Sequence, residues 1–269
     1  MSAITRINRT AGSPFSPFWF GVSAVTFCYL AFIVALIAAT ATYSEPGDLL
    51  RSLNKREIQY SILLSLLTCS VTAVLSLLIA APAGYLLARA RFPGKALVES
   101  ALDIPIVLPP MVIGLCLLIF FQTRMGGWIE HVIPFTYTVY GVVLAQLVIG
   151  AAFAIRTMRG TFENLSSRPE DVAMTLGCSR GQAVLLVTVP AAWRGMLAAM
   201  SVAWARSMGE FGPILVFAGA TRMKTEVLPT TVWLELSVGN LQEAVAVSLL
   251  MVLFAMIVLV AVRRAGEKI

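Results

Sequence analysis

The sequence predicts an all-α integral membrane protein of about six transmembrane helices. Of its 269 residues, 58% are apolar and only 13% are charged, and the mean hydropathy is +0.85. Because a soluble domain carries about 25% charged residues, most of the surface of this chain faces lipid and not water. The second observation is a series of uncharged tracts that are long enough to cross a bilayer.

A helix rises about 1.5 Å per residue, so a hydrocarbon core of about 30 Å requires roughly 20 apolar residues. Five uncharged tracts meet this length, and a sixth does so if Arg206 and Glu210 are accepted inside it. The first tract is longer than the apolar region of a signal peptide, so we expect it to remain as a span. In chain order, we predict spans over residues 18–42, 58–88, 104–123, 132–155, 195–221 and 244–262.

The connections between these tracts differ in their content of Lys and Arg. Thirteen of these residues lie on the side of the N-terminus, six lie on the opposite side, and Arg206 lies within a span. Cytoplasmic connections carry the excess of Lys and Arg, so we predict a multi-pass membrane protein with both termini in the cytoplasm. The same bias explains the net charge of +6, and we expect no nucleic-acid partner.

Residue types that carry catalysis or bind metals form no pattern. His131 is the only histidine, which excludes a multi-histidine metal site and argues against a histidine-based triad. The four cysteines Cys28, Cys69, Cys116 and Cys178 lack metal-ligand or redox spacing, so we interpret them as small hydrophobic residues. We predict no catalytic residue and no metal site.

Arg206 and Glu210 lie four residues apart and therefore on one face of the fifth predicted span. A lone charge at the helix centre costs about 2.5–3.5 kcal/mol on insertion scales, so this pair should face away from lipid. Gly209 and Gly212 indicate a break or kink at the same depth. Two interpretations remain open: a polar brace beside a water-filled path, or a salt bridge that only locks the bundle.

Prolines interrupt two other tracts. Pro109 and Pro110 stand in the third tract, where their missing N–H groups free backbone carbonyls that lipid does not satisfy. We therefore predict that this helix faces the bundle interior, and we count both prolines among the candidate pore residues. Pro82 and Gly84 predict a break near the end of the long second tract. In each case a simple kink without function is the alternative.

The longest cytoplasmic connection, residues 156–194, carries the pattern of two short helices hinged at a glycine. Pro169 can start the first helix, and Gly177 suits its C-terminal cap. The second helix is predicted over residues 184–189 and ends at Pro190. A short amphipathic element at this surface rests either on lipid or on a partner protein.

This loop resembles the EAA motif of the permease subunits of ATP-binding-cassette (ABC) importers, with the spacing of its glycine and proline kept. Departures from the motif are conservative: aspartate replaces glutamate, and valine replaces alanine, isoleucine and leucine. The resemblance implies that the loop, residues 168–190, docks on a separate ATPase, since the chain has no Gly-x-x-x-x-Gly-Lys-Ser/Thr phosphate loop. The residues assigned to it are Glu170, Asp171, Val172, Ala173, Leu176, Gly177, Ser179, Val187, Val189 and Pro190.

A second resemblance indicates the subfamily. The run Arg206-Ser-Met-Gly-Glu210-Phe-Gly212 is similar to the R-x-x-G-E-F-G segment of molybdate, tungstate and sulfate permeases, and the segment at Pro109 and Pro110 also fits them. This resemblance implies import of an oxyanion, with molybdate or tungstate preferred over sulfate. Phosphate, thiamine or ferric-ion import and a secondary transporter are the alternatives, although the chain shows no convincing inverted repeat.

The resemblance also implies an assembly. In the family, the permease forms a homodimer in the lipid bilayer of a prokaryotic plasma (inner) membrane, two ATPase subunits use ATP and Mg, and an extracytoplasmic substrate-binding protein delivers the solute. This chain would then bind no cofactor and catalyse no reaction. We assign residues 1–57 to an N-terminal segment with the first span and an outer loop, residues 58–262 to the permease core, and residues 263–269 to a cytoplasmic tail.

Overall fold

The computed structural model describes residues 17–43 and 46–267, and every regular element within them is helical. The chain divides between Glu45 and Pro46 into two compact units. Two segments, η1 and η2, are π-helical. The helices are α1 (Pro17–Thr42), α2 (Pro46–Asn54), α3 (Arg56–Arg89), α4 (Lys95–Val107), α5 (Pro110–Gln122), α6 (Arg124–Val132), α7 (Val139–Asn164), α8 (Arg168–Thr175), α9 (Arg180–Ala183), η1 (Val184–Thr188), α10 (Val189–Ala191), α11 (Trp193–Met208), η2 (Ile214–Ala218), α12 (Leu228–Val238) and α13 (Leu241–Glu267).

The described part of the first unit is the single helix α1. It is 26 residues long and contains no charged residue. The hydroxyls of Thr26 and Thr40 donate to the carbonyls of Val22 and Leu36, each at 2.9 Å, so these polar groups are satisfied within the helix. A helix that satisfies its own polar groups is suited to lipid, and the first predicted span is confirmed.

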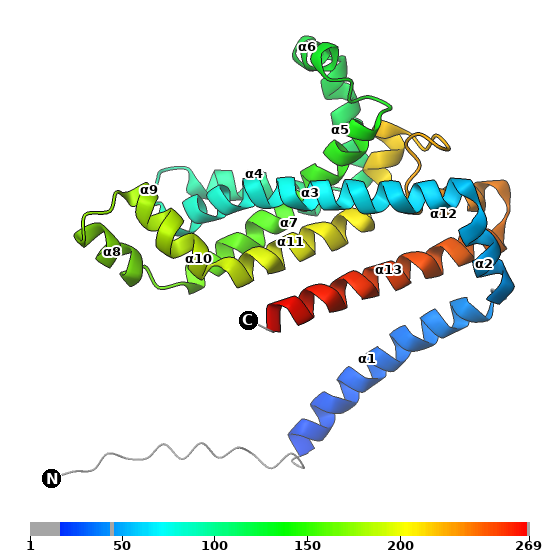
Figure 1. The fold of residues 1–269 in the computed structure, drawn as a ribbon, viewed down its shortest axis with the longest axis horizontal. Coiled ribbons are helices and arrows are strands. Elements are labelled where there is room, and N and C mark those ends of the chain that lie inside the picture. Colours follow the sequence, from blue (N-terminus) through cyan, green and yellow to red (C-terminus); the bar gives the residue numbers. More distant parts are fainter. Residues whose placement is uncertain (1–16, 44–45, 268–269) are drawn as a thin grey trace. The chain divides into compact units, whose positions relative to one another are not determined.

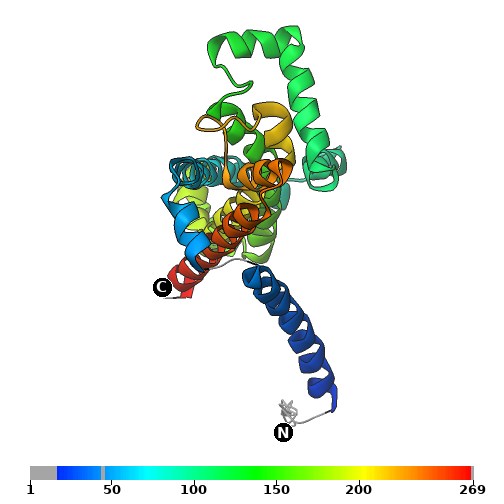
Figure 2. The ribbon, with the colours of Figure 1, turned by 90° about the vertical axis from the view of Figure 1, so that its right-hand side faces the viewer.

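The centre of the second unit is formed by α3, α7 and α11, which lie side by side in both ribbon views (Figures 1 and 2). Small residues allow this approach. A Cβ atom on Gly84 of α3 would lie 2.7 Å from Cβ of Met158 on α7, and one on Gly195 of α11 would lie 2.1 Å from the methyl group of Thr161 on α7. Helices in membranes pack closely through such small residues, and here they bring the three central helices together.

The predicted number of spans is consistent with the structure. Among the described residues, four helices are long and apolar enough to cross a membrane: Phe18–Thr42, Arg56–Arg89, Val139–Asn164 and Leu241–Val260. Two further spans are formed if each bent pair of helices counts as one. The pairs are α4 with α5, bent by 110°, and residues 180–191 with α11, bent by 71°.

Three predicted spans have wrong boundaries. The third, 104–123, crosses the break between α4 and α5, where Leu108 and Pro109 are extended because a residue before proline avoids the helical region. In the fourth, 132–155, the helix begins only at Val139. In the fifth, 195–221, α11 ends at Met208, one residue before Gly209. Hydropathy measures apolar length but does not detect caps or breaks.

The predicted break at Pro82 and Gly84 is also wrong, because α3 continues through both residues to Arg89. A proline within a helix removes one backbone hydrogen bond. In a helical bundle, neighbouring groups re-satisfy the freed carbonyl, so an intramembrane proline does not require a break. Gly84 serves instead as the site of close contact with α7.

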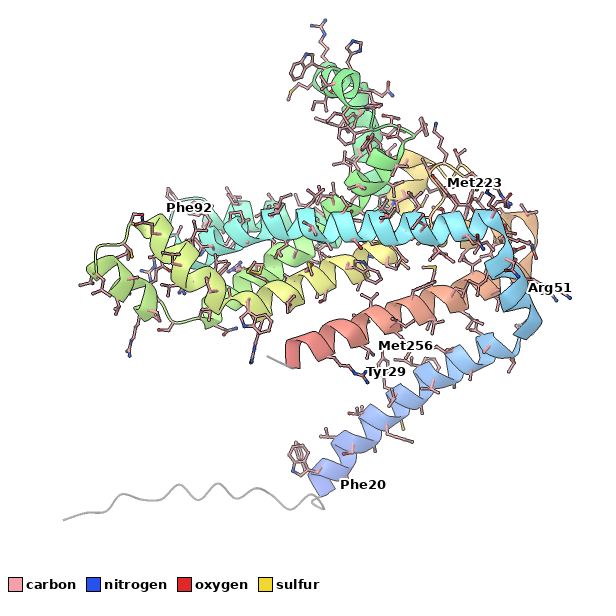
Figure 3. All side chains as sticks on the ribbon, in the orientation of Figure 1. Phe20, Tyr29, Arg51, Phe92, Met223 and Met256 are labelled. Carbon is pink, nitrogen blue, oxygen red and sulfur yellow. The ribbon has the colours of Figure 1, made fainter. Side chains whose placement is uncertain are left out.

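The second unit has two polar ends. Phe92, beyond the C-terminal end of α3, lies at the end of the bundle opposite to Arg51 of α2 and Met223 of the loop before α12 (Figure 3). The end near Phe92 carries α8, η1 and α10, whereas the end near Met223 carries α2 and α12 (Figure 1). The predicted coupling loop therefore lies at the end of the bundle opposite to α2 and α12.

Candidate functional site

The two helix breaks contact each other. The prediction that the third tract faces the bundle interior is wrong for most of its length, because only one face of α5 packs against η2: no described residue of α4 is buried, and Pro109 and Pro110 are exposed. A Cβ atom on Gly212, in the break between α11 and η2, would lie 3.0 Å from the backbone nitrogen of Met111, the second residue of α5. A Cβ atom on Gly114 of α5 would lie 2.8 Å from Cα of Pro213. Each break thus fits against the other through a glycine. The candidate pore residues near Pro110 and near Gly212, about 100 positions apart in the sequence, form one site.

The charged pair lies at the end of α11, beside this junction. Nη1 of Arg206 is 2.6 Å from Oε1 of Glu210, whose side chain is 1% exposed, whereas that of Arg206 is 32% exposed. The guanidinium also lies 5.7 Å from the centroid of the Phe153 ring. Neither carboxylate oxygen of Glu210 has a well-aligned hydrogen bond within the described residues. The ion pair with Arg206 is therefore the main compensation for the buried Glu210 charge.

A buried stripe of hydroxyl groups runs along α3 and was not predicted from the sequence. Five Ser and Thr residues on this helix are each at most 2% exposed. They recur every three or four positions, which places them on one helical face, so their spacing was the signal that was available. The stripe consists of Ser61, Ser65, Thr68, Thr72 and Ser76.

This stripe faces a buried glutamine of α7. Thr72 donates to Oε1 of Gln146 at 3.2 Å, and Nε2 of Gln146 donates to the backbone carbonyl of Ser207 on α11 at 3.3 Å. Gln146 is 1% exposed. A polar side chain in a membrane bundle needs partners on neighbouring helices. This network therefore fixes the register of α3, α7 and α11 at Ser207, two residues before the break at Gly209.

The predicted coupling loop forms two short helical segments with Gly177 between them. The first segment, α8, begins near Pro169 and ends before Gly177, as predicted. Gly177 has φ +98°, a conformation that residues with a side chain rarely adopt. The second segment differs from the prediction. It begins at Arg180, four residues earlier than expected, and continues through Pro190 to Ala191. Ser179 caps it with a capping box, in which its hydroxyl and the Gln182 side chain bond reciprocally to the backbone.

Some residues of the coupling loop are buried against the bundle, and others are exposed at its surface. Glu170 is 5% exposed, and its carboxylate accepts hydrogen bonds from Tyr85 of α3 at 2.5 Å and from Thr188 of η1 at 2.9 Å. Ala173 is buried as well. The other loop residues assigned from the sequence are exposed or half-buried, and four large apolar side chains stand out into solvent. These are Val172, Leu176, Leu185 and Leu186.

Glu170 therefore ties the loop to the bundle. Its two hydrogen bonds join α8 to the C-terminal part of α3 and to η1. Hydrogen bonds to a charged acceptor contribute about 1.5–3 kcal/mol, which is sufficient to hold this junction together. Asp171, the residue at the first position of the motif, is instead exposed.

At the opposite end, ion pairs connect the loop between η2 and α12 with α3. Arg222 contacts Glu57 at 2.5 Å and Glu235 at 2.8 Å. Glu226 of the same loop is 1% exposed, and its Oε2 has no hydrogen-bond partner in the described part of the chain. Burial raises the pKa of Glu226, and the nearby Arg222 opposes this rise only in part. The fold thus favours the protonated form of Glu226.

We expect Glu226→Gln to stabilise the protein at high pH. The native pKa is above the ordinary value, so the contribution of Glu226 to stability is complete below that ordinary value and is lost as the pH rises through the raised pKa. The amide stays neutral, so the variant should lose this dependence and gain about 1–3 kcal/mol above the raised pKa. Thermal unfolding midpoints of the wild type and the variant, recorded in detergent from about pH 4 to about pH 8, measure this difference in stability.

Glu163→Gln is the control for this prediction, because the Glu163 side chain is also 45% exposed and pairs with Arg159, away from Glu226 and Arg222. A pH profile of Glu226→Gln that is as steep as that of the wild type would contradict the prediction.

Broken spans that contact each other at their breaks are features of membrane permeases, and the two bent helix pairs of this chain place it in that class. Residues 80–267 match the family of the binding-protein-dependent transport system inner membrane component, so the chain belongs to this family. It is a permease subunit of an ABC importer and not an enzyme.

Several curated relatives are permease proteins for oxyanions. The chain is 35% identical over 190 residues to the molybdate/tungstate transport system permease protein WtpB of Thermococcus kodakarensis, covering 71% of this chain and 72% of the relative. It is 34% identical over 179 residues to the molybdenum transport system permease protein ModB of Escherichia coli K12, covering 64% and 77%. It is 32% identical over 167 residues to the sulfate transport system permease protein CysT of Escherichia coli K12, covering 61% of this chain and 60% of the relative.

The fold is also similar to that of a solved transporter. A chain in the crystal structure of a bacterial alginate ABC transporter, in complex with an alginate pentasaccharide-bound periplasmic protein, superposes with a TM-score of 0.73. The alignment covers 93% of this chain and 94% of that chain at 12% identity. At this identity the likeness concerns the fold alone, and it confirms the predicted fold class.

Proposed function

We propose that this chain is the permease subunit through which an ATP-driven importer carries an oxyanion, molybdate or tungstate, across the inner membrane. The observation that carries the proposal is the similarity to relatives named as molybdate/tungstate and molybdenum permeases over about two thirds of the chain. Sulfate is the second candidate, because CysT is similar to nearly the same degree.

The proposed assembly contains two copies of this chain, two ATPase subunits that use ATP and Mg, and an extracytoplasmic binding protein. This chain itself binds no cofactor. Both termini lie in the cytoplasm, so the end with α8 and η1 faces the ATPase and the end with α2 and α12 faces the binding protein. The apolar residues Val172, Leu176 and Leu186, exposed on the coupling loop, support docking of this segment on a protein surface.

The contacts of the loop suggest how ATP use is coupled to transport. Closure of the ATPase pair would move α8, and the hydrogen bonds of Glu170 would carry this movement to Tyr85 on α3 and to Thr188 on η1. From η1 the chain continues through the 71° bend into α11, which ends at the junction of the two breaks. Such a movement shifts the population between inward-open and outward-open states.

The junction itself supplies the polar part of the path. Irregular backbone at Pro109 and at Gly209 exposes peptide groups that lipid does not satisfy, so we place the path beside them. The half-exposed guanidinium of Arg206 contributes positive potential for an anion. Glu210 orients this guanidinium, and its negative charge reduces the net positive charge of the pair. The anion would then bind weakly enough to pass.

Uptake into proteoliposomes tests the substrate. The chain is reconstituted with its ATPase and its binding protein, and ATP-dependent uptake of molybdate, tungstate and sulfate is compared. We expect molybdate and tungstate to be taken up and to be only weakly inhibited by sulfate. Uptake of sulfate alone would overturn the assignment of the substrate while leaving the permease role in place.

We expect Gly177→Val to abolish most ATP-driven uptake while the protein remains inserted. A valine at φ +98° is strained by about 1–3 kcal/mol, which displaces α8 relative to α9. Gly181→Val is the matched control. A Cβ atom added to either glycine would meet nothing within 4 Å, but Gly181 lies in α9 and has no positive φ. Uptake and membrane yield are measured for both. Equal uptake by the two variants would contradict the role of the hinge.

A further inference from the structure

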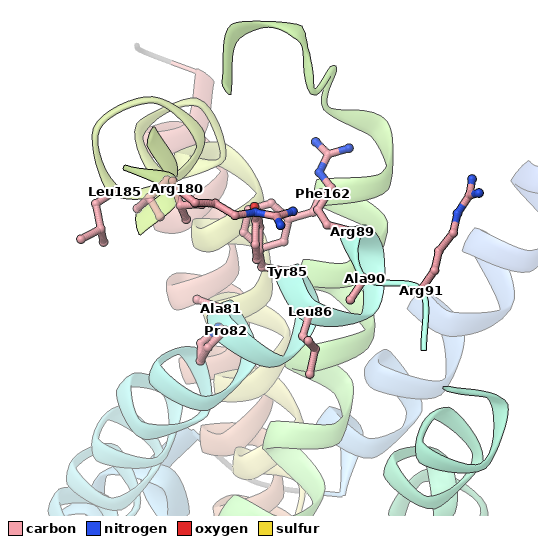
Figure 4. Close-up of a pocket in the computed structure, with 12 residues that line it drawn as sticks. Ala81, Pro82, Tyr85, Leu86, Arg89, Ala90, Arg91, Phe162, Arg180 and Leu185 are labelled. Carbon is pink, nitrogen blue, oxygen red and sulfur yellow. The ribbon is translucent and has the colours of Figure 1, made fainter. Parts of the chain in front are cut away.

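A pocket of about 830 Å³ lies at the end of the bundle that carries the coupling loop (Figure 4). It is formed by the C-terminal part of α3, by Phe162 of α7, and by α9, η1 and α10 of the loop. Pro82 and Leu86 of α3 and Leu185 of η1 contribute apolar wall. Both the bundle and the coupling loop therefore contact whatever occupies this pocket.

Three arginines line the same pocket. Arg89 and Arg91 come from the end of α3, and Arg180 extends from α9 above Tyr85 toward the end of α3 (Figure 4). Arg89 donates to the Leu165 carbonyl at 2.8 Å through Nη2, and its Nε has no partner within the described residues. A pocket with this lining has a strongly positive mouth.

No carboxylate neutralises these arginines inside the pocket. No aspartate or glutamate is among the described residues that line it, and none of the ion pairs found in residues 46–267 involves Arg89, Arg91 or Arg180. The nearby carboxylate of Glu170 is buried and accepts hydrogen bonds from Tyr85 and Thr188. The complementary ligand is an anion attached to an apolar body.

The position of the pocket along α3 favours a lipid as this ligand. Arg89, the last residue of α3, and Arg91, two residues beyond it, follow the apolar part of α3, whereas Pro82 lies two turns earlier within it. Arginine guanidinium groups bind phosphate bidentately, and basic pockets between transmembrane helices on the cytoplasmic side suit anionic head groups. A soluble anion would leave the apolar walls in contact with water.

We propose that this pocket binds an anionic phospholipid of the cytoplasmic leaflet, with its head group at the mouth that Arg89, Arg91 and Arg180 line and its acyl chain along Pro82, Leu86 and Leu185. The assignment of the leaflet rests on the proposed function, which places this end in the cytoplasm. Because Arg180 and Leu185 belong to the coupling loop, the bound lipid braces this loop against α3 and so stabilises the path from the ATPase to the bundle.

Native mass spectrometry of the full complex tests the site. The permease with its ATPase subunits is offered phosphatidylglycerol or phosphatidylcholine, and retained lipid is counted. We expect selective retention of phosphatidylglycerol, and we expect the triple variant Arg89→Gln, Arg91→Gln and Arg180→Gln to lower it roughly 100-fold, since each arginine at an anionic surface contributes about a fivefold gain in affinity.

A triple variant with the same change of charge is the control. Arg156, Arg194 and Arg264 are exposed and do not line the pocket, so their replacement by glutamine should leave retention unchanged. Leu86→Trp fills the apolar part without changing charge and should also lower retention. Inorganic phosphate at matched concentration distinguishes a site for the head group alone, because a phosphate site would tolerate Leu86→Trp.

Equal retention by the two triple variants would overturn the proposal. So would retention by the isolated chain but not by the complex, which would mean that a partner protein covers the pocket. Retention of inorganic phosphate in place of lipid would assign the arginines to a soluble anion. None of these readouts depends on transport, so they separate failure of the lipid site from failure of the proposed function.

Discussion

Arg206→Met is expected to reduce the yield of folded protein more than any other single substitution proposed for this chain. Glu210 is 1% exposed, and Arg206 is its ion-pair partner at 2.6 Å. Removing one member of a buried pair leaves an uncompensated charge and costs about 3–5 kcal/mol. The yield of monodisperse protein in detergent and its thermal midpoint measure this effect.

The double variant Arg206→Met and Glu210→Gln separates the two interpretations of the pair. It removes both charges, so folded yield should return to near the level of the wild type. If the pair only locks the bundle, uptake should return as well. We expect uptake to remain low, because the proposed path loses the positive potential of Arg206.

Arg194→Met is the matched control, because Arg194 lies at the exposed start of the same helix and contacts only the ring of Trp193, at 5.7 Å, among the interactions found in the described residues. It should alter neither yield nor uptake. If Glu210→Gln alone lowers neither transport nor folded yield, the proposed role of the pair is wrong.

Gly114→Ala is expected to give the second largest effect. The added Cβ would lie 2.8 Å from Cα and 2.9 Å from the carbonyl oxygen of Pro213. Both are backbone atoms that cannot rotate away, so α5 and the break before η2 must separate. Overpacking of this kind costs about 1–3 kcal/mol, and it acts at the proposed path. We expect a lower thermal midpoint and a loss of most ATP-driven uptake.

Gly160→Ala provides a matched comparison for this substitution. Gly160 is also helical, within α7, but nothing lies within 4 Å of a Cβ atom at this position. The change should be neutral or should stabilise the helix by up to about 1 kcal/mol. Similar midpoints and similar uptake for the two variants would show that the two breaks do not pack tightly against each other.

Several features of this protein followed from local sequence alone. The uncharged tracts gave the number of spans because a helix must present about 20 apolar residues to cross the hydrocarbon. The first helix of the coupling loop and the turn at Gly177 were also predicted correctly. Proline favours the first turn of a helix and glycine favours its C-terminal cap, and both preferences depend only on neighbouring residues. The coupling and pore roles of individual residues stay predictions, as do the boundaries at residues 57 and 262.

Other features required contacts between distant segments. The position of Glu170 as an anchor depends on Tyr85, 85 residues earlier in the chain, and no local pattern distinguishes it from the exposed Asp171 beside it. The break expected at Pro82 does not occur, because packing in the bundle compensates for a missing backbone hydrogen bond. The spacing of the Ser and Thr residues on α3 can be recognised in the sequence, but their contact with Gln146 of α7 cannot.

The sequence by itself determined that this is a helical membrane protein, which tracts are long enough to cross a bilayer, and where the loop turns at Gly177, because each depends on the length, composition or dihedral preference of a short segment. Only the tertiary structure decided that the breaks at Pro109 and Gly212 meet, since this depends on the close approach that Gly114 and Gly212 permit between α5 and the end of α11. Helix association in lipid is driven by such fits of small residues and not by hydrophobicity, which is why hydropathy finds the helices but not their contacts.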